Sequence, residues 1–224
     1  MEHSLLSMQT VQAETVEKGR IYNTPEGNFW SVTTMLSATK NNKGLQEWKE
    51  RVGEDEAKKI CQKATQFGTQ FHECCEQYLM NKGQFTVHSS NPIVLQAFNI
   101  AKPLLKKSIS VVYGIELPLY SKRLQLAGRT DAIVEWEGKL SILDYKFISK
   151  VYDINTYVDY FLQCTAYAYM VQEMYNICPK NIVLFLMPRI GNSPIVLNQG
   201  CDKYLVQLNQ RIKSFRQIEK YKLL

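Results

Sequence analysis

The sequence has no cysteine pattern that typically binds a structural metal or builds a disulfide framework. Its 6 cysteines include no Cys-x-x-Cys pair and no histidine at zinc-finger spacing. This excludes the common structural zinc motifs, and we expect the cysteines to be reduced thiols that are mostly buried.

Long apolar runs are also missing. No stretch approaches the roughly 18 apolar residues of a membrane span, so we expect no membrane partner. Residues 1–19 have neither the apolar run of a secretion signal nor the acid-poor composition of a mitochondrial transit peptide. We therefore expect a cytoplasmic protein in a reducing compartment.

The charge is not extreme either. Against 21 Asp and Glu there are 27 Lys and Arg, and the net charge of +6 suits a polyanionic partner without requiring one. The 224 residues, 45% of them hydrophobic, suffice to bury a core, so we expect a single domain over residues 1–224. Within it we expect a flexible arm at 1–19, a mainly helical part at 20–108 and an α/β core at 109–224.

Helical periodicity is present in five parts of the chain. Helices are predicted at residues 44–63, 68–80, 92–108, 154–175 and 202–222. The first is either one amphipathic helix or two short ones broken at Gly53. The third begins at Pro92, and Pro103 should kink or divide it.

β-branched and apolar runs predict five strands. They are expected at residues 110–120, 124–136, 139–147, 181–188 and 194–198. Short turns at 121–123 and 137–138 connect the first three, and the last two form a hairpin around Gly191 and Asn192. The resulting order is helices, three strands, a helix, two strands and a helix.

Two aspartates face each other if Glu137 and Gly138 are the central residues of a tight turn. Paired positions then sum to 275, which places Asp131 opposite Asp144. Opposed Cβ atoms are only about 5 Å apart, and like charges there destabilise a sheet unless a cation lies between them. A divalent metal would supply that charge.

Two cations share this face of the sheet. Lys146 lies two residues beyond Asp144, and Arg129 falls opposite Lys146 by the same arithmetic. One interpretation is a ladder of solvated ion pairs in which these cations neutralise Asp131 and Asp144. Against it, residues 140–147 are apolar enough for a covered sheet, where unpaired carboxylates are costly.

Polar side chains on two helices offer further candidates. Thr69, His72 and Glu76 are spaced three and four apart and project from one helix face. His72 is either a partly buried histidine hydrogen-bonded to Glu76 or a metal ligand. Gln163 and Tyr167 lie one turn apart on the later helix, where the alternative is an aromatic core helix with an incidental amide.

Four motifs, taken in their order along the chain, resemble the RecB-like branch of the PD-(D/E)XK nuclease superfamily. They are Gly68-Thr-x-x-His72-x-x-x-Glu76, Gly128-Arg-x-Asp131, Asp144-x-Lys146 and Gln163-x-x-x-Tyr167. Upstream segments are similar to the family of the mitochondrial genome maintenance exonuclease and its phage relatives. These are Arg20-x-Tyr22-x-x-Pro25-x-Gly27, Ser31-Val-Thr33-x-x-Leu36 and Leu45-x-x-Trp48. The resemblance implies an α/β fold: a mixed central β-sheet flanked by helices, with an N-terminal helical extension.

The resemblance also implies roles for individual residues. The implied metal ligands are His72, Asp131, Asp144 and the backbone carbonyl of Tyr145, with Glu116 as a possible further ligand. Lys146 would be the catalytic lysine, acting with the two aspartates. Thr69 and Glu76 would contact the metal ligands without binding the metal themselves. The residues expected to contact DNA are Ser31, Thr33, Arg129, Gln163 and Tyr167.

The resemblance thus implies a metal-dependent DNA exonuclease that prefers single-stranded ends and acts in replication, recombination or repair. Together with the features of residues 1–19 it favours the cytoplasm of a bacterium or a phage-infected host cell, and a mitochondrial location only if a transit peptide has been removed. We expect Mg²⁺ or Mn²⁺, since carboxylates suit both and an imidazole ligand favours tolerance of Mn²⁺. No iron–sulfur cluster is expected, because only Cys178 and Cys201 follow the long helix, whereas cluster-binding members have three closely spaced cysteines there. The alternatives are a structure-specific endonuclease of the same fold and a catalytically inactive nucleic-acid-binding module.

Overall fold

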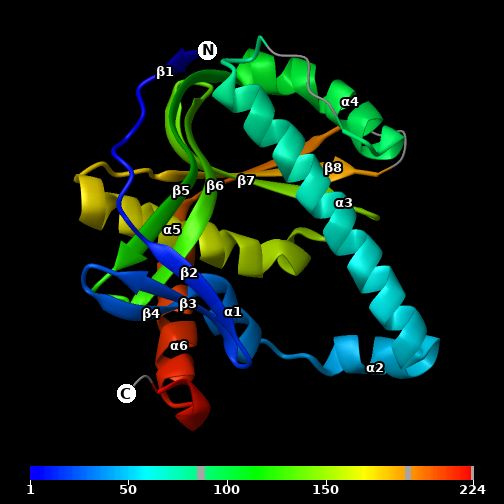
Figure 1. Cartoon of the computed structure of the whole chain (residues 1–224), viewed down its shortest axis with the longest axis vertical. Helices are drawn as coiled ribbons and strands as arrows, with labels where there is room; N and C mark the ends of the chain where they lie inside the picture. The colour runs from blue at the N-terminus through cyan, green and yellow to red at the C-terminus, as the bar shows by residue number, and fades with distance from the viewer. Residues whose placement is uncertain (85–88, 190–192, 223–224) are drawn as a thin grey trace.

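The computed structural model describes residues 1–84, 89–189 and 193–222. In these residues nine strands form one sheet (Figure 1). The strands are β1 (Glu2–His3), β2 (Gln12–Val16), β3 (Gly19–Thr24), β4 (Gly27–Ser31), β5 (Ile109–Ser121), β6 (Leu126–Trp136), β7 (Lys139–Ile148), β8 (Asn181–Pro188) and β9 (Ile195–Gly200). The helices are α1 (Val32–Ala38), α2 (Lys43–Val52), α3 (Glu54–Met80), α4 (Pro92–Ser108), α5 (Val158–Tyr175) and α6 (Leu205–Arg216), with 3₁₀ turns η1 (Ile154–Tyr157), η2 (Cys201–Tyr204) and η3 (Glu219–Tyr221).

The sheet is mixed, as the family resemblance implies. Its order is β2-β3-β4-β6-β7-β8-β9, and β5 pairs with both β6 and β1. The pairs β1–β5, β4–β6 and β7–β8 are parallel, whereas the remaining pairs are antiparallel. The β6–β7 turn has the predicted register, and both Glu137 and Gly138 have positive φ, which suits a two-residue hairpin turn.

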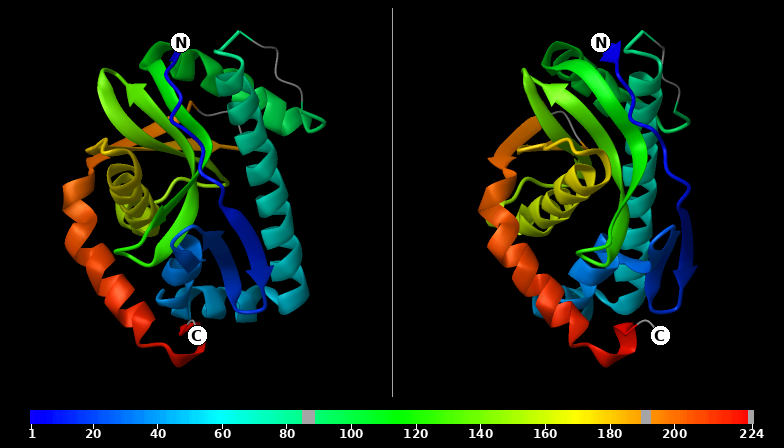
Figure 2. Two further views of the ribbon diagram at one scale, coloured as in Figure 1. Left: turned by 60° about the vertical axis from the view of Figure 1, so that its left-hand side comes forward. Right: turned by 90° about the vertical axis from the view of Figure 1, so that its left-hand side faces the viewer.

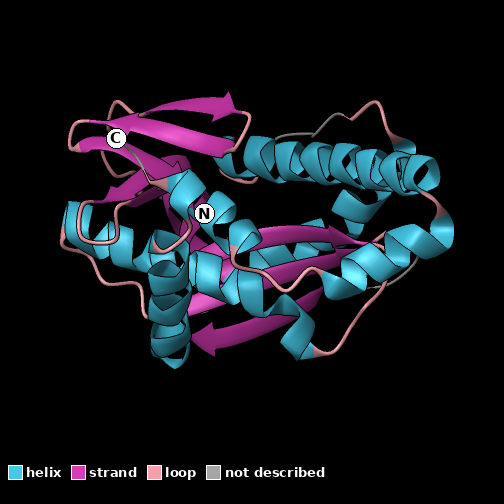
Figure 3. Cartoon of the chain, turned by 90° about the horizontal axis from the view of Figure 1, so that it is seen from below, coloured by secondary structure: helices cyan, strands magenta, loops and turns pink. Residues whose placement is uncertain are grey.

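Helices cover both faces of the sheet and bury two apolar clusters. α5 and α6 lie on one side of the strands and α3 on the other (Figure 2), and the view from below shows strands running between helices (Figure 3). Phe71 and Tyr78 of α3 are fully buried against Trp136 and Phe185, while Phe161 of α5 lies in the opposite cluster. Each such side chain contributes about 1.5–3 kcal/mol of burial free energy. None of the helices described is both long and apolar enough to cross a membrane.

Helix boundaries differ from the predictions in several places: α1 was not predicted, and the helix predicted at 202–222 consists of η2, α6 and η3. Gly53, with a φ of 84°, separates α2 from α3, the second of the two alternatives, but α3 then runs unbroken for 27 residues. Gly68 therefore lies inside a helix rather than at its start, a cost of about 1 kcal/mol that the buried face of α3 offsets. Pro103 does not divide α4, whose buried Ala101 and Leu105 continue across it.

The prediction of a flexible arm at residues 1–19 was wrong. This segment contributes β1, which pairs in parallel with β5, and β2, which pairs with β3. Most of β2 is exposed and polar, so its pairing depends on backbone hydrogen bonds that hydrophobic periodicity does not reveal. At the other end of the sheet β8 and β9 are antiparallel as expected, whereas Gly191 and Asn192 of their predicted turn lie outside the described residues.

Candidate active site

A cleft of about 490 Å³ opens where α3 crosses the sheet beside the β3–β4 hairpin. Most of the residues expected at the site line it. These are Ser31, Thr33, Thr69, His72, Glu76, Glu116, Arg129, Asp131, Gln163 and Tyr167. They come from α1, α3, α5 and three strands, so the fold brings together segments that are far apart in the sequence.

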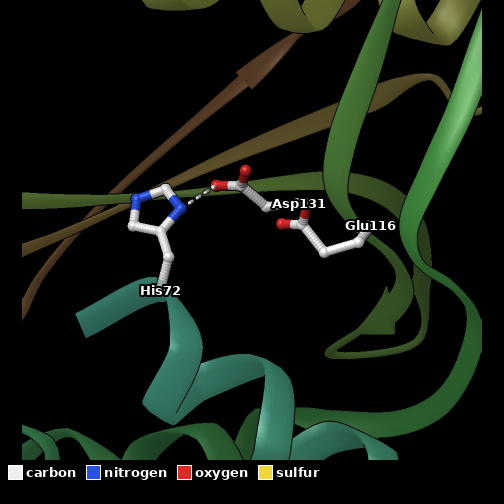
Figure 4. Close-up of side chains that lie close together, drawn as sticks. All are labelled: His72, Glu116 and Asp131. Carbon is white, nitrogen blue, oxygen red and sulfur yellow. Dashed lines mark ion pairs between the residues drawn. The ribbon is translucent and has the colours of Figure 1, made fainter. Parts of the chain in front are cut away.

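Three potential metal ligands converge at the floor of this cleft. One ligand atom each from His72, Glu116 and Asp131 lies within 4.8 Å of the others. The His72 ring of α3 points at Asp131 of β6, with 3.3 Å between Nδ1 and Oδ2, and the Glu116 carboxylate of β5 lies beside them (Figure 4). A helix and two neighbouring strands therefore supply one donor each.

The β5–β6 register explains why Glu116 lies beside Asp131. Ile115 pairs with Ala132 and Leu117 pairs with Thr130, so Glu116 and Asp131 occupy the opposed positions between them. Glu116 has a φ of 47°, in the left-handed region that residues other than glycine rarely adopt. Such backbone strain persists where the surroundings enforce it, and here it accompanies a carboxylate turned into the cleft.

Asp131 also marks the point where β6 and β7 separate. The paired residues end at Ala132 and Leu143, and the next β7 amide, that of Tyr145, donates instead to Asp131 Oδ2 over 2.8 Å. The carboxylate thus takes the place of a strand partner. This fixes its orientation and opens the sheet beside it.

Asp144 and Lys146 form a buried ion pair next to the cleft. The Asp144 side chain is 2% exposed and that of Lys146 is 17% exposed. Gln163 Nε2 donates to Asp144 Oδ1 over 3.3 Å, and the ring of Tyr160 lies 4.6 Å from Lys146 Nζ. The burial argues against a ladder of solvated ion pairs.

Burial disfavours the ionised form of two carboxyl groups at the site. Burial, followed by repulsion from Asp131, raises the pKa of Glu116 to about 7 despite the ion pair with Arg129. Burial likewise raises the pKa of Asp144 to about 6, against the opposing effect of Lys146. A site that disfavours its own ionised carboxylates in this way is suited to an added cation.

Asp131 behaves differently from these two carboxylates. Burial alone raises its pKa, but His72, Lys146 and the Tyr145 amide together outweigh burial, so the net shift is downward. The donor set of one imidazole and several carboxylate oxygens fits a hard divalent cation such as Mg²⁺ or Mn²⁺. The residues present therefore fit the metal that the sequence analysis expects.

Comparison with known proteins agrees with this geometry. The profile of the PD-(D/E)XK nuclease superfamily matches residues 91–221, more than half of the chain. The chain belongs to this superfamily. Mitochondrial genome maintenance exonuclease 1 of Homo sapiens is 26% identical over 160 residues, covering 63% of this chain and 46% of that protein. The Mus musculus protein of the same name is 31% identical over 146 residues, covering 61% and 42%. The chain spans less than half the length of these relatives, and both findings support a nuclease role.

Not every predicted contact of this nuclease domain is present. Arg129 does not face Lys146, because β6 and β7 have separated by that point; its Nε instead lies 2.9 Å from Glu116 Oε2. One interpretation of His72 was a hydrogen bond to Glu76. In the described part of the chain, His72 instead forms an ion pair with Asp131. Asp144, Tyr145 and Lys146 lie beside the cleft rather than along its lining.

Five residues that line the cleft were not among the predicted site residues: Arg20, Tyr22, Gly68, Glu73 and Gly128. Arg20 and Tyr22 project from β3, and Glu73 follows His72 on α3. The Arg-x-Tyr spacing is a usable signal, since alternate residues of a strand share one face. Glu73 has no such signal, because neighbouring helix positions diverge by about 100°.

Gly128 is required by the close approach of β6 to α5. A Cβ atom at this position would lie 2.5 Å from Cε1 of Tyr167 and 2.8 Å from its hydroxyl oxygen. We expect Gly128→Ala to lower the free energy of unfolding by about 1–3 kcal/mol through overpacking, measured by urea denaturation. Gly200→Ala is the matched control, because Gly200 is also a strand residue and the nearest atom to its added Cβ is 3.9 Å away. Equal stability of the two variants would show that Tyr167 moves aside freely.

Proposed function

We propose that this chain is a metal-dependent deoxyribonuclease that removes nucleotides from the ends of single-stranded DNA. The observation that carries the proposal is the convergence of His72, Glu116 and Asp131 in one cleft, beside the buried pair of Asp144 and Lys146. Most of the side chains that line the cleft are polar or charged. Replication, recombination or repair would be the setting for such an activity.

The metal would be Mg²⁺ or Mn²⁺, held by His72, Asp131 and Asp144 with the backbone carbonyl of Tyr145. Glu116 is the further candidate ligand, since it belongs to the converged group. When bound, the cation would neutralise phosphate charge and make a nearby water more acidic.

The chain's own residues would prepare the hydrolysis. Lys146 Nζ, beside the Asp144 carboxylate, would orient a water and offset negative charge as a new bond forms between the water oxygen and phosphorus. The bond from phosphorus to the leaving sugar oxygen breaks in the same reaction. Gln163 would hold Asp144 in place through its amide.

The mouth of the cleft has groups that suit a phosphodiester backbone. Arg20 and Arg129 supply positive charge. At the start of α1 the hydroxyl of Thr33 would offer a neutral hydrogen bond to a phosphate oxygen. The hydroxyl of Ser31, 3.0 Å from that of Thr33, instead donates to Thr34 Oγ1 and accepts from the Thr34 N–H, so its role is to cap α1. These contacts are independent of base identity, so we expect no strong sequence preference.

A closed circular single strand separates exonuclease from endonuclease action. Wild type should degrade a linear strand, labelled at either end, in the presence of Mg²⁺ or Mn²⁺ but not of chelator, and leave a circle of the same sequence intact. The position of the label that is released first also gives the polarity. Cleavage of the circle would favour a structure-specific endonuclease, and binding of both without cleavage would favour an inactive binding module.

The preference for single strands needs a separate comparison. We expect slower degradation of a blunt duplex than of its component strand, because the strand end must first fray to reach the cleft. Equal initial rates on the two substrates would contradict this part of the proposal while leaving the nuclease activity intact.

A further inference from the structure

The ammonium group of Lys146 has a second neighbour that no motif includes. Its Nζ contacts the Asp144 carboxylate and also lies over the ring of Tyr160, 4.6 Å from the ring centroid. A cation in this position is attracted by the negative face of the ring. Two groups of different kinds therefore hold the end of a long, flexible side chain.

The Tyr160 ring is itself held in place. It stacks on Tyr157, with 6.3 Å between the ring centroids and 28° between the planes. Tyr157 is 3% exposed, and its hydroxyl oxygen accepts a hydrogen bond of 3.0 Å from the backbone N–H of Tyr152. The ring beneath Lys146 is thus tied to the segment that follows β7.

Tyr160 lies on α5 close to another residue of the site. Tyr160 and Gln163 are three residues apart, so they are neighbours on the helix surface. Gln163 donates to the carboxylate of Asp144, while Tyr160 underlies the ammonium of Lys146. One turn of α5 therefore contacts both partners of the buried ion pair.

We propose that Tyr160 is a positioning residue for Lys146: its ring holds the ammonium at the Asp144 side of the cleft in the orientation that cleavage requires. The effect on cleavage rests on the proposed function, whereas the placement of Lys146 does not. Tyr160 acts through the lysine, so its loss should lower kcat while leaving KM unchanged.

The kinetic test compares two substitutions. Tyr160→Leu removes the ring, and we expect kcat on single-stranded DNA to fall on the order of 10-fold with unchanged KM. Tyr160→Phe keeps the ring and should retain the wild-type kcat. Tyr169→Leu is the matched control, since Tyr169 lies on the same helix and its hydroxyl contacts Arg123 instead. A rise in KM with unchanged kcat would overturn the proposal and indicate that the ring binds the strand.

A second measurement does not depend on cleavage. Protons held over an aromatic ring resonate upfield, so the ε-methylene protons of Lys146 should be shifted upfield in metal-free, DNA-free protein, with the assignment made from Lys146→Met. The shift should persist in Tyr160→Phe and disappear in Tyr160→Leu. An unchanged resonance in a folded Tyr160→Leu would overturn the proposal. If the protein cuts no DNA and the shift still depends on the ring, the placement stands and only the proposed function fails.

Discussion

Lys146→Ala is expected to reduce cleavage of single-stranded DNA by roughly 10²–10³-fold while DNA binding remains near wild type. Loss of one preorganised charge that acts in the transition state typically has an effect of this size. Binding should persist because the cleft lining, with Arg20 and Arg129, does not include Lys146. Single-turnover rates with saturating protein measure the first effect, and fluorescence anisotropy with a labelled strand measures the second.

Two further variants make this result interpretable. Lys139→Ala removes an exposed lysine at the opposite end of β7 and should leave both rate and affinity unchanged. Lys146→Met keeps most of the buried apolar stem without the charge, so it separates the loss of the ammonium from the loss of packing. If Lys146→Met cleaves at the wild-type rate in a folded protein, the catalytic role of the lysine is wrong.

The position of the aspartates shows how far sequence reasoning reaches. The turn at residues 137–138 fixed the register correctly as far as Ala132 and Leu143. Beyond that point a simple ladder predicts Arg129 opposite Lys146. The arithmetic fails there because the Asp131 side chain accepts the backbone N–H of Tyr145, which a regular ladder would pair with backbone. The two-residue periodicity of a strand predicts the face to which each side chain points. It does not predict that a side chain will replace a backbone group as a hydrogen-bond partner.

The same limit applies at the edges of the sheet. Residues 12–16 form a strand although they are polar and mostly exposed, because β3 supplies the hydrogen bonds. Glu116 was only a possible ligand in the sequence, since its left-handed backbone conformation has no sequence signal outside glycine and asparagine. Helical spacing placed His72 and Gln163 each on one helix face with a second polar or aromatic residue, but it left their roles open, and the family resemblance supplied those roles.

Asp131→Asn is expected to abolish both metal-induced stabilisation and cleavage with little change to the metal-free fold. Asparagine retains an oxygen that can accept from the Tyr145 amide, but it lacks the charge that a hard cation requires. Mn²⁺ at about 100 times its Kd should stabilise wild type by about 2.7 kcal/mol. For a domain of this size that corresponds to a rise in Tm of roughly 5–10 °C, whereas the variant should show none.

The control for this experiment is Asp202→Asn, which removes an exposed carboxylate in η2 and should retain the full rise in Tm. Thermal melts of metal-free protein, with and without added Mn²⁺, give the stabilities, and cleavage of a labelled strand gives the activity. A metal-induced rise in Asp131→Asn equal to that of wild type would place the cation elsewhere. Burial and the repulsion from Asp131 would then account for the raised pKa of Glu116 without a metal, and the ion pair of His72 with Asp131 would be a contact that stabilises the fold.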